Sequence, residues 1–222
     1  MSSGGRWGLI LGLALVSASS IWSQVKVARS AEPKSVAGPV VVSTPTATAT
    51  ARIPLSPPLV RYARAQVGKT LYYDPTYTVL AYPGGDVPIE RGVCTDVVIR
   101  ALRPLGVDLQ QAVHEDMRAH FAAYPTTWGL QHPDRNIDHR RVPNLQRWFE
   151  RQRWSQPVTQ TAADYRAGDL VTWMLPGGLP HIGIVSDRKA GSRPLIIHNV
   201  GRGAREDDVL FAWPVTGHYR RR

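Results

Sequence analysis

Hydrophobic side chains recur at helical spacing through the first half of the region after residue 56. A return every three or four positions is typical of a helix with one buried face. Three segments share this pattern and are predicted to be helices: residues 57–68, 95–105 and 108–124. Pro143 begins another such segment, NLQRWFERQ, and proline is favoured at a helix start.

The hydrophobic pattern changes in the last third of the chain. Short β-branched runs bounded by Gly, Pro and Asp occupy residues 169–173, 181–186 and 194–198. Such runs predict strands of an antiparallel sheet, and residues 209–213 are expected to add another. Helices followed by a sheet favour an α+β fold, with the helices packed on the sheet, over a parallel α/β fold.

The first 23 residues have the pattern of a secretory signal. Arg6 precedes an apolar run from Trp7 to Val16, and small residues follow it. Even extended to Trp22, the run is shorter than the ~20 apolar residues of a spanning helix. We expect residues 1–23 to be a signal peptide or an N-terminal anchor that tethers the protein to the membrane. Either way, the protein is expected to be exported to the periplasm or cell envelope.

Residues 24–55 differ in composition from the rest of the chain. They are rich in Val, Thr, Ala, Ser and Pro and contain no aromatic residue. Because such a segment cannot easily build a packed core, we interpret it as a flexible linker. Residues 56–222 then suit one globular domain, which we expect to be monomeric.

The net charge of +10 raises the question of nucleic-acid binding. The basic residues are mostly arginines scattered along the chain, with only four lysines. No DNA- or RNA-binding motif accompanies them, so no nucleic-acid partner is expected. In an exported protein, this charge favours attraction to an anionic polymer of the envelope.

Cys94 is the only cysteine in the 222 residues. It stands in RGVCTDVVIRAL, where a glycine turn leads into a predicted helix. The free N–H groups and partial positive charge of a helix N-terminus stabilise a thiolate. Cys94 is therefore a candidate nucleophile, with a small buried hydrophobic residue as the alternative.

Two histidines accompany neighbouring predicted strands. His181 begins one run and His198 ends the next. If the runs pair as an antiparallel hairpin, the start of one lies opposite the end of the other, and the histidines are side by side. Cys94, His181 and His198 would then serve as nucleophile, general base and orienting residue. The alternatives are structural histidines or, from the same three residue types, a zinc site.

The chain also resembles known families. The series GDLVTW, HIGIVSD and IIHN after a Cys-led helix resembles the NlpC/P60 group of papain-like cysteine hydrolases. A longer likeness, carried by YPGGDVPIERGVCTDVVIRALR, DRNIDHRRVPNLQ, LPHIGIVSD, IIHNVGRG and GHYR, is to the family DUF1287. The resemblance implies a papain-like fold, with Cys94, His181 and His198 as catalytic residues.

The chain departs from the common NlpC/P60 pattern Asp-Cys-Ser-Gly around the cysteine. Asp96 in the first helical turn would cap the helix or bind an amine of the substrate. Arg140 and Arg141 would clamp a substrate carboxylate or pair within the protein. Asn199 would orient a histidine or form a turn.

These features together predict an exported cysteine hydrolase. Its expected substrate is an amide in the stem peptide of peptidoglycan or a related envelope polymer, and no metal or organic cofactor is expected. Two alternatives stay open, an acyl or amide transferase on the same fold and a non-catalytic wall-binding module. His218, in GHYR, is a rival to His198 as the third catalytic residue.

Overall fold

The computed structural model describes residues 56–221. The predicted signal or anchor at 1–23 and the predicted linker at 24–55 lie outside the described residues. Within the described part, no helix is both long enough and apolar enough to cross a membrane.

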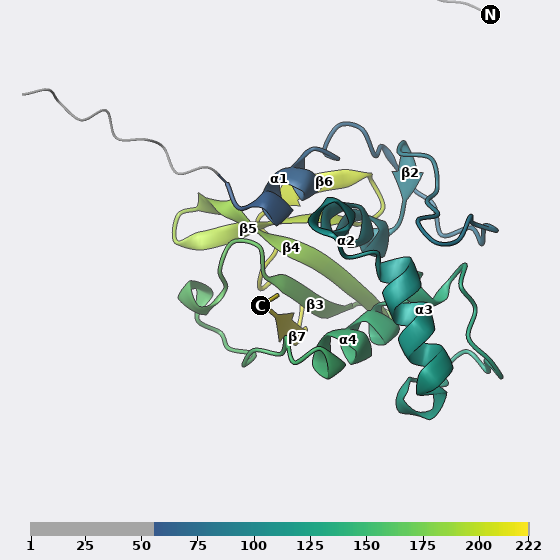
Figure 1. Cartoon of the computed structure of the whole chain (residues 1–222). Helices are drawn as coiled ribbons and strands as arrows, with labels where there is room; N and C mark the ends of the chain where they lie inside the picture. The colour runs from purple at the N-terminus through teal and green to yellow at the C-terminus, as the bar shows by residue number, and fades with distance from the viewer. Residues whose placement is uncertain (1–55, 222) are drawn as a thin grey trace, which may run out of the picture. The chain divides into compact units, whose positions relative to one another are not determined.

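The described residues form a mixed α+β structure, as the sequence predicts (Figure 1). The α-helices are α1 (Pro58–Arg64), α2 (Cys94–Leu102), α3 (Leu109–Ala119) and α4 (Val142–Arg151). The strands are β1 (Tyr72–Tyr73), β2 (Arg91–Gly92), β3 (Leu170–Leu175), β4 (Leu179–Ala190), β5 (Arg193–Asn199), β6 (Ala204–Asp207) and β7 (Val215–Tyr219). Short 3₁₀ segments follow α2 and α3 and precede α4.

The last five strands form one antiparallel sheet in the order β6-β5-β4-β3-β7. Helices α1, α2 and α4 cover one face of this sheet, and α3 lies to the side against α2 and α4 (Figure 1). The two short strands β1 and β2 pair in parallel and form a separate two-stranded sheet. Strand β2 leads directly into α2.

Alternation along the strands gives the sheet a core on each face. Ile182 and Ile184 of β4 point into the core under the helices, with Val97 and Val98 of α2. Val185 points to the other face and joins a smaller core around Trp173. Period-two alternation therefore places β4 between two hydrophobic layers.

The predicted strand at residues 209–213 is wrong. These residues form a turn whose apolar side chains, including buried Leu210, cover the smaller core. They are hydrophobic because they cover a sheet face, not because they belong to the sheet. The actual fourth and fifth strands, β6 and β7, have polar sequences, ARED and VTGHY, that lack a clear strand pattern.

Candidate active site

Cys94 is the first residue of α2, as the sequence predicts. Its side chain is buried, with 4% of its surface exposed. Cys94 and Thr95 occupy the helix start, where backbone N–H groups lack partners within the helix. The thiol therefore lies where hydrogen-bond donors converge.

The backbone just before Cys94 is fixed by two side chains. Asn199 Nδ2 donates to the Gly92 carbonyl oxygen over 2.9 Å, and Asp96 Oδ2 accepts from the Val93 N–H over 2.7 Å. A Cβ at Gly92 would lie 2.8 Å from Asp96 Oδ2, so this close approach requires glycine. The prediction that Asp96 caps the helix is confirmed, whereas Asn199 positions the approach to Cys94 rather than a histidine.

His181 and His198 lie together, as the hairpin pattern predicts. Nε2 of His181 is 2.9 Å from Nδ1 of His198, and both side chains are buried. The register, Ile184 opposite Ile197, makes the two histidines diagonal neighbours instead of direct partners. Gly183 leaves room for this arrangement, since a Cβ there would lie 3.1 Å from the Cβ of His198.

His198 has an acidic partner, Asp207, that was not among the site residues predicted from the sequence. Nε2 of His198 lies 3.3 Å from Oδ2 of Asp207 on the neighbouring strand β6. Because a carboxylate only accepts, His198 donates from Nε2 and accepts at Nδ1. His181 then donates from Nε2, which leaves its Nδ1 as the basic nitrogen. The acidic run REDD after IIHN was the available signal.

Two tryptophans enclose the histidine pair. The ring centres of Trp173 and Trp213 lie 5.8 Å and 5.9 Å from that of His181. Trp213 also lies 6.3 Å from the His198 ring centre. These rings limit the access of water to the imidazoles on this side of the sheet.

The Cys94 thiol contacts strand β4 at one backbone N–H group. The Ile182 N–H, next to His181 in the chain, acts as a hydrogen-bond donor to the Cys94 thiol and lowers its pKa. The thiol makes no side-chain hydrogen bond to either histidine within residues 56–221. The structure thus places Cys94 at the backbone of Ile182, the residue that follows His181 in β4.

Burial decides the protonation of the thiol and of its neighbouring imidazole. It raises the pKa of Cys94 to about 12, against the smaller lowering by backbone donors. It also lowers the pKa of His181 to about 3, with nearby His198 adding to the effect. Desolvation therefore outweighs the helix N-terminus and favours the neutral thiol over the thiolate expected at the helix start.

Arg140 is already paired within the protein. Its Nε and Nη2 donate to Asp96 Oδ1 and Oδ2 over 3.0 Å and 2.9 Å. Both side chains are almost fully buried, and Arg140 also donates to backbone carbonyls of Asp74 and Thr76. Two roles were expected for Arg140, binding a substrate carboxylate or pairing within the protein, and the structure shows the pairing.

A cavity of about 190 Å³ opens beside Cys94. Its walls include Tyr73, Pro180 and Trp128. Two arginines also line it: Arg140 at the end of the 3₁₀ segment and Arg141 at the start of α4. Burial and the neighbouring Cys94 raise the pKa of Tyr73 to about 12, so its hydroxyl stays neutral. The cavity is large enough for a small polar group of a ligand to enter next to the thiol.

His218 lies elsewhere. Its Nε2 is 2.7 Å from Asp169 Oδ2, and its Nδ1 is 3.0 Å from the Pro157 carbonyl oxygen. Because both of its ring nitrogens already have hydrogen-bond partners, His218 stabilises the packing of β7 and does not line the cavity beside Cys94. Across residues 56–221, no three His, Cys, Asp or Glu side chains are arranged to hold a metal ion.

Comparison with known proteins places this chain in a family. Residues 60–221, which contain Cys94, His181 and His198, match the family described as a domain of unknown function, DUF1287. The chain is also similar to the uncharacterized protein YijF of Escherichia coli strain K12. The two are 61% identical over 159 residues, which are 71% of this chain and 78% of that protein. This chain belongs to the DUF1287 family.

Proposed function

We propose that this protein is an exported cysteine hydrolase of papain-like, NlpC/P60-type fold that cleaves an amide bond in the peptide of peptidoglycan. The observations that support the chemistry are the line from Asp207 through His198 to His181 and the contact of Cys94 with the backbone N–H of Ile182, the next residue after His181. This line orients one imidazole and leaves its Nδ1 basic, which is the arrangement a nucleophilic thiol needs.

In the first half-reaction, the S–H proton of Cys94 passes to Nδ1 of His181 as sulfur attacks the carbonyl carbon of the amide. The backbone N–H of Cys94 donates to the oxyanion that forms. The C–N bond then breaks, and the proton on His181 moves to the leaving nitrogen. The products of this half are a free amine and a thioester on Cys94.

In the second half-reaction, water attacks the thioester. His181 accepts a proton from the water and returns it to the departing sulfur. The acyl group leaves as a carboxylic acid, and the thiol is restored. An amine in place of water would give a transferase by the same steps, so the acceptor decides between these two activities.

The resting protonation states set the order of proton and bond movements. A raised pKa for Cys94 and a lowered pKa for His181 make both groups neutral near pH 7. The proton therefore moves during the attack on the carbonyl, and His181 acts as a general base. A preformed thiolate–imidazolium pair is not required.

The choice of substrate rests on different observations. The N-terminal signal pattern supports export, and the net charge of +10 supports attraction to an anionic envelope polymer. The resemblance to NlpC/P60 hydrolases supports a peptide amide as the bond that is cut. These three observations agree on the peptide of the cell wall.

Release of amino groups from purified peptidoglycan tests this proposal. The wild type should release new amines, and Cys94→Ser and His181→Asn should each lose at least about 100-fold in rate, as general-base loss costs ~10²–10⁴-fold. His120→Asn is the matched control and should keep full activity, because His120 is exposed and its one partner among residues 56–221 is Asp116. Firm binding without amine release by the folded wild type would instead support a wall-binding module.

A further inference from the structure

The cavity beside Cys94 contains an arginine whose charge no carboxylate neutralises among the described residues. Arg141 is half-buried at the start of α4, and its Nη1 is shielded from solvent without a hydrogen-bond partner in residues 56–221. Its neighbour Arg140, by contrast, is satisfied by both carboxylate oxygens of Asp96. The two arginines share a cavity wall but differ in what they can offer a ligand.

Trp128 holds the guanidinium of Arg141. The guanidinium carbon lies 4.4 Å from the centre of the indole ring, within the range of a cation–π contact. Such stacking occupies the face of the guanidinium and leaves the edge formed by Nε and Nη2, which unlike Nη1 are not shielded from solvent, for a planar anion. Tyr73 and Pro180 on other walls of the cavity bring no competing charge.

The surroundings of Arg141 favour an anionic ligand. Partial burial lowers its pKa, and Asp138 and Asp134 oppose this effect only by longer-range attraction, without an ion pair. A desolvated cation without a partner gains most from a carboxylate that binds both of its edge nitrogens. Because Cys94 lines the same cavity, a group bound to Arg141 lies next to the thiol.

We propose that Arg141 binds a free carboxylate of the substrate, beside the amide that Cys94 attacks. The substrate class is therefore a peptide that carries an acidic group close to the scissile bond. This inference rests on the proposed function and adds to it a residue that determines specificity. Arg140 instead has a positioning role, through Asp96.

Paired ligands test this role without turnover. The probes are a soluble tetrapeptide from the peptidoglycan stem with its carboxylates free, and the same peptide with its carboxylates converted to carboxamides. Binding is measured by calorimetry on Cys94→Ala, which cannot cleave either probe. The carboxylate form should bind about tenfold more tightly or better, since charge-assisted hydrogen bonds contribute ~1.5–3 kcal/mol.

Substitution of Arg141 should remove this preference. In the Cys94→Ala background, Arg141→Gln should bind both probes alike, and Arg141→Lys should keep part of the preference because it keeps the charge without the planar fork. Arg147→Gln is the matched control on the same helix and should keep the full preference, because Arg147 is exposed and pairs with Glu150. Circular dichroism of each variant checks that it is folded.

Two results would overturn the inference. Equal binding of the two probes to Cys94→Ala with Arg141 intact would show that no carboxylate is recognised, whether or not the Arg141 variants fold. Full preference in folded Arg141→Gln would show that another group recognises it. Neither result affects the cysteine hydrolase itself, which is judged by amine release with Cys94 present.

Discussion

At the residue scale, Cys94 shows two opposed effects on one thiol. The start of α2 and the Ile182 N–H favour the thiolate, whereas burial favours the thiol. Burial dominates and raises the pKa of the thiol to about 12, so the neutral thiol is the favoured form at pH 7. In the proposed mechanism, the reactivity of Cys94 therefore depends on a substrate and on His181 rather than on a stored negative charge.

Alkylation of the single thiol measures this protonation state. Because the thiolate is the nucleophile, iodoacetamide should modify folded Cys94 much more slowly at pH 7 than the same protein unfolded in urea. The rate in the folded protein should rise only at alkaline pH, as expected for the raised pKa of this thiol. Mass spectrometry reads the result directly, since no other cysteine is present.

Rapid alkylation of the folded protein at pH 5 to 6 would contradict this account. It would show a thiolate stabilised by an imidazolium, the form common to preformed ion pairs. The urea-unfolded protein is the control, because its thiol has an ordinary pKa and full access to the reagent.

The sequence was informative about individual site residues but not about their partners. His181 and His198 are predictable neighbours because strand runs on either side of a short turn pair as a hairpin. The bond from His198 to Asp207 depends on β6, whose polar sequence ARED gives no strand signal. The pairing of Asp96 with Arg140 joins positions 44 residues apart, which no local pattern encodes.

At the element scale, β5 positions both halves of the candidate site. His198 on one face of this strand contacts His181, and Asn199 on the other binds the backbone before Cys94. The end of a single strand therefore holds both the partner of His181 and the backbone that leads into Cys94. Displacement of β5 relative to β4 should disturb both halves together.

Gly183→Ala tests the packing of β4 against β5. A Cβ at this position would lie 2.6 Å from the Cγ2 of Ile196 and 3.1 Å from the Ile197 carbonyl oxygen. Overpacking of this kind costs about 1–3 kcal/mol of unfolding free energy, which urea denaturation measures, and should displace His198. Leu179→Ala, at an exposed position of the same strand, should change stability little; equal stability of both variants would contradict the assigned packing.

The 3₁₀ segment Asp138–Arg140 is joined to α2 by a buried ion pair. Arg140→Gln leaves the Asp96 carboxylate without its charged partner, and breaking a buried pair costs about 3–5 kcal/mol. The unfolding free energy of this variant should fall by that amount. Arg147→Gln, which breaks the exposed pair with Glu150, should lower it by less than about 1 kcal/mol. A similar small loss in both variants would show that the buried pair does not hold this segment.

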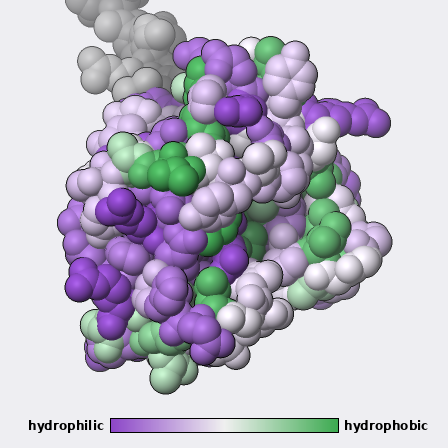
Figure 2. All heavy atoms as spheres, turned by 90° about the vertical axis from the view of Figure 1, so that its right-hand side faces the viewer, coloured by the Kyte–Doolittle hydropathy of each residue, from purple (hydrophilic) through white to green (hydrophobic). Residues whose placement is uncertain are grey.

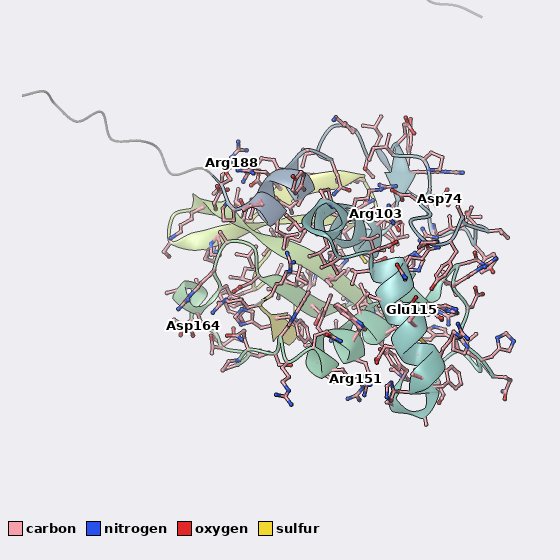
Figure 3. All side chains as sticks on the ribbon, viewed as in Figure 1. Asp74, Arg103, Glu115, Arg151, Asp164 and Arg188 are labelled. Atoms are coloured by element: carbon pink, nitrogen blue, oxygen red, sulfur yellow. The ribbon has the colours of Figure 1, made fainter. Side chains whose placement is uncertain are left out.

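At the scale of the whole described domain, arginines and carboxylates mostly pair with each other. Ion pairs such as Arg151–Asp116, Arg100–Asp86 and Arg193–Asp208 connect separate elements. The labelled charges in Figure 3 lie on many different elements, and the face in Figure 2 shows hydrophobic patches separated by hydrophilic residues. Arg141 differs from these paired arginines in having no carboxylate partner within the described part of the chain.

Buried neutral histidines should make the domain sensitive to acid. Burial lowers the pKa of His139, His181 and His198, to about 3 for the first two, against about 6.5 in an unfolded chain. Below pH 6.5 the unfolded state therefore binds protons that the folded state does not. The unfolding free energy should fall as the pH drops from 6.5 to 4.5, by up to about 1.4 kcal/mol per pH unit for each histidine.

Urea denaturation at pH 7.0, 5.5 and 4.5 measures this slope. The raised pKa of Asp138 opposes it, by at most one proton. His139→Asn should reduce the slope of the unfolding free energy against pH by about 1.4 kcal/mol per pH unit, the contribution of one proton. This expectation holds whatever the substitution does to stability at pH 7. An unchanged slope in this variant would show that His139 is not a buried neutral group.

The central claim is that Cys94 cleaves a peptide amide in peptidoglycan with water as the acceptor. Its most direct test is mass spectrometry of the soluble fragments released from purified peptidoglycan in ¹⁸O-labelled water, by the wild type and by Cys94→Ser. The account predicts that the wild type alone releases fragments with a new amine and a new carboxylate that carries one ¹⁸O. The same fragments from Cys94→Ser, or none from the folded wild type, would contradict it.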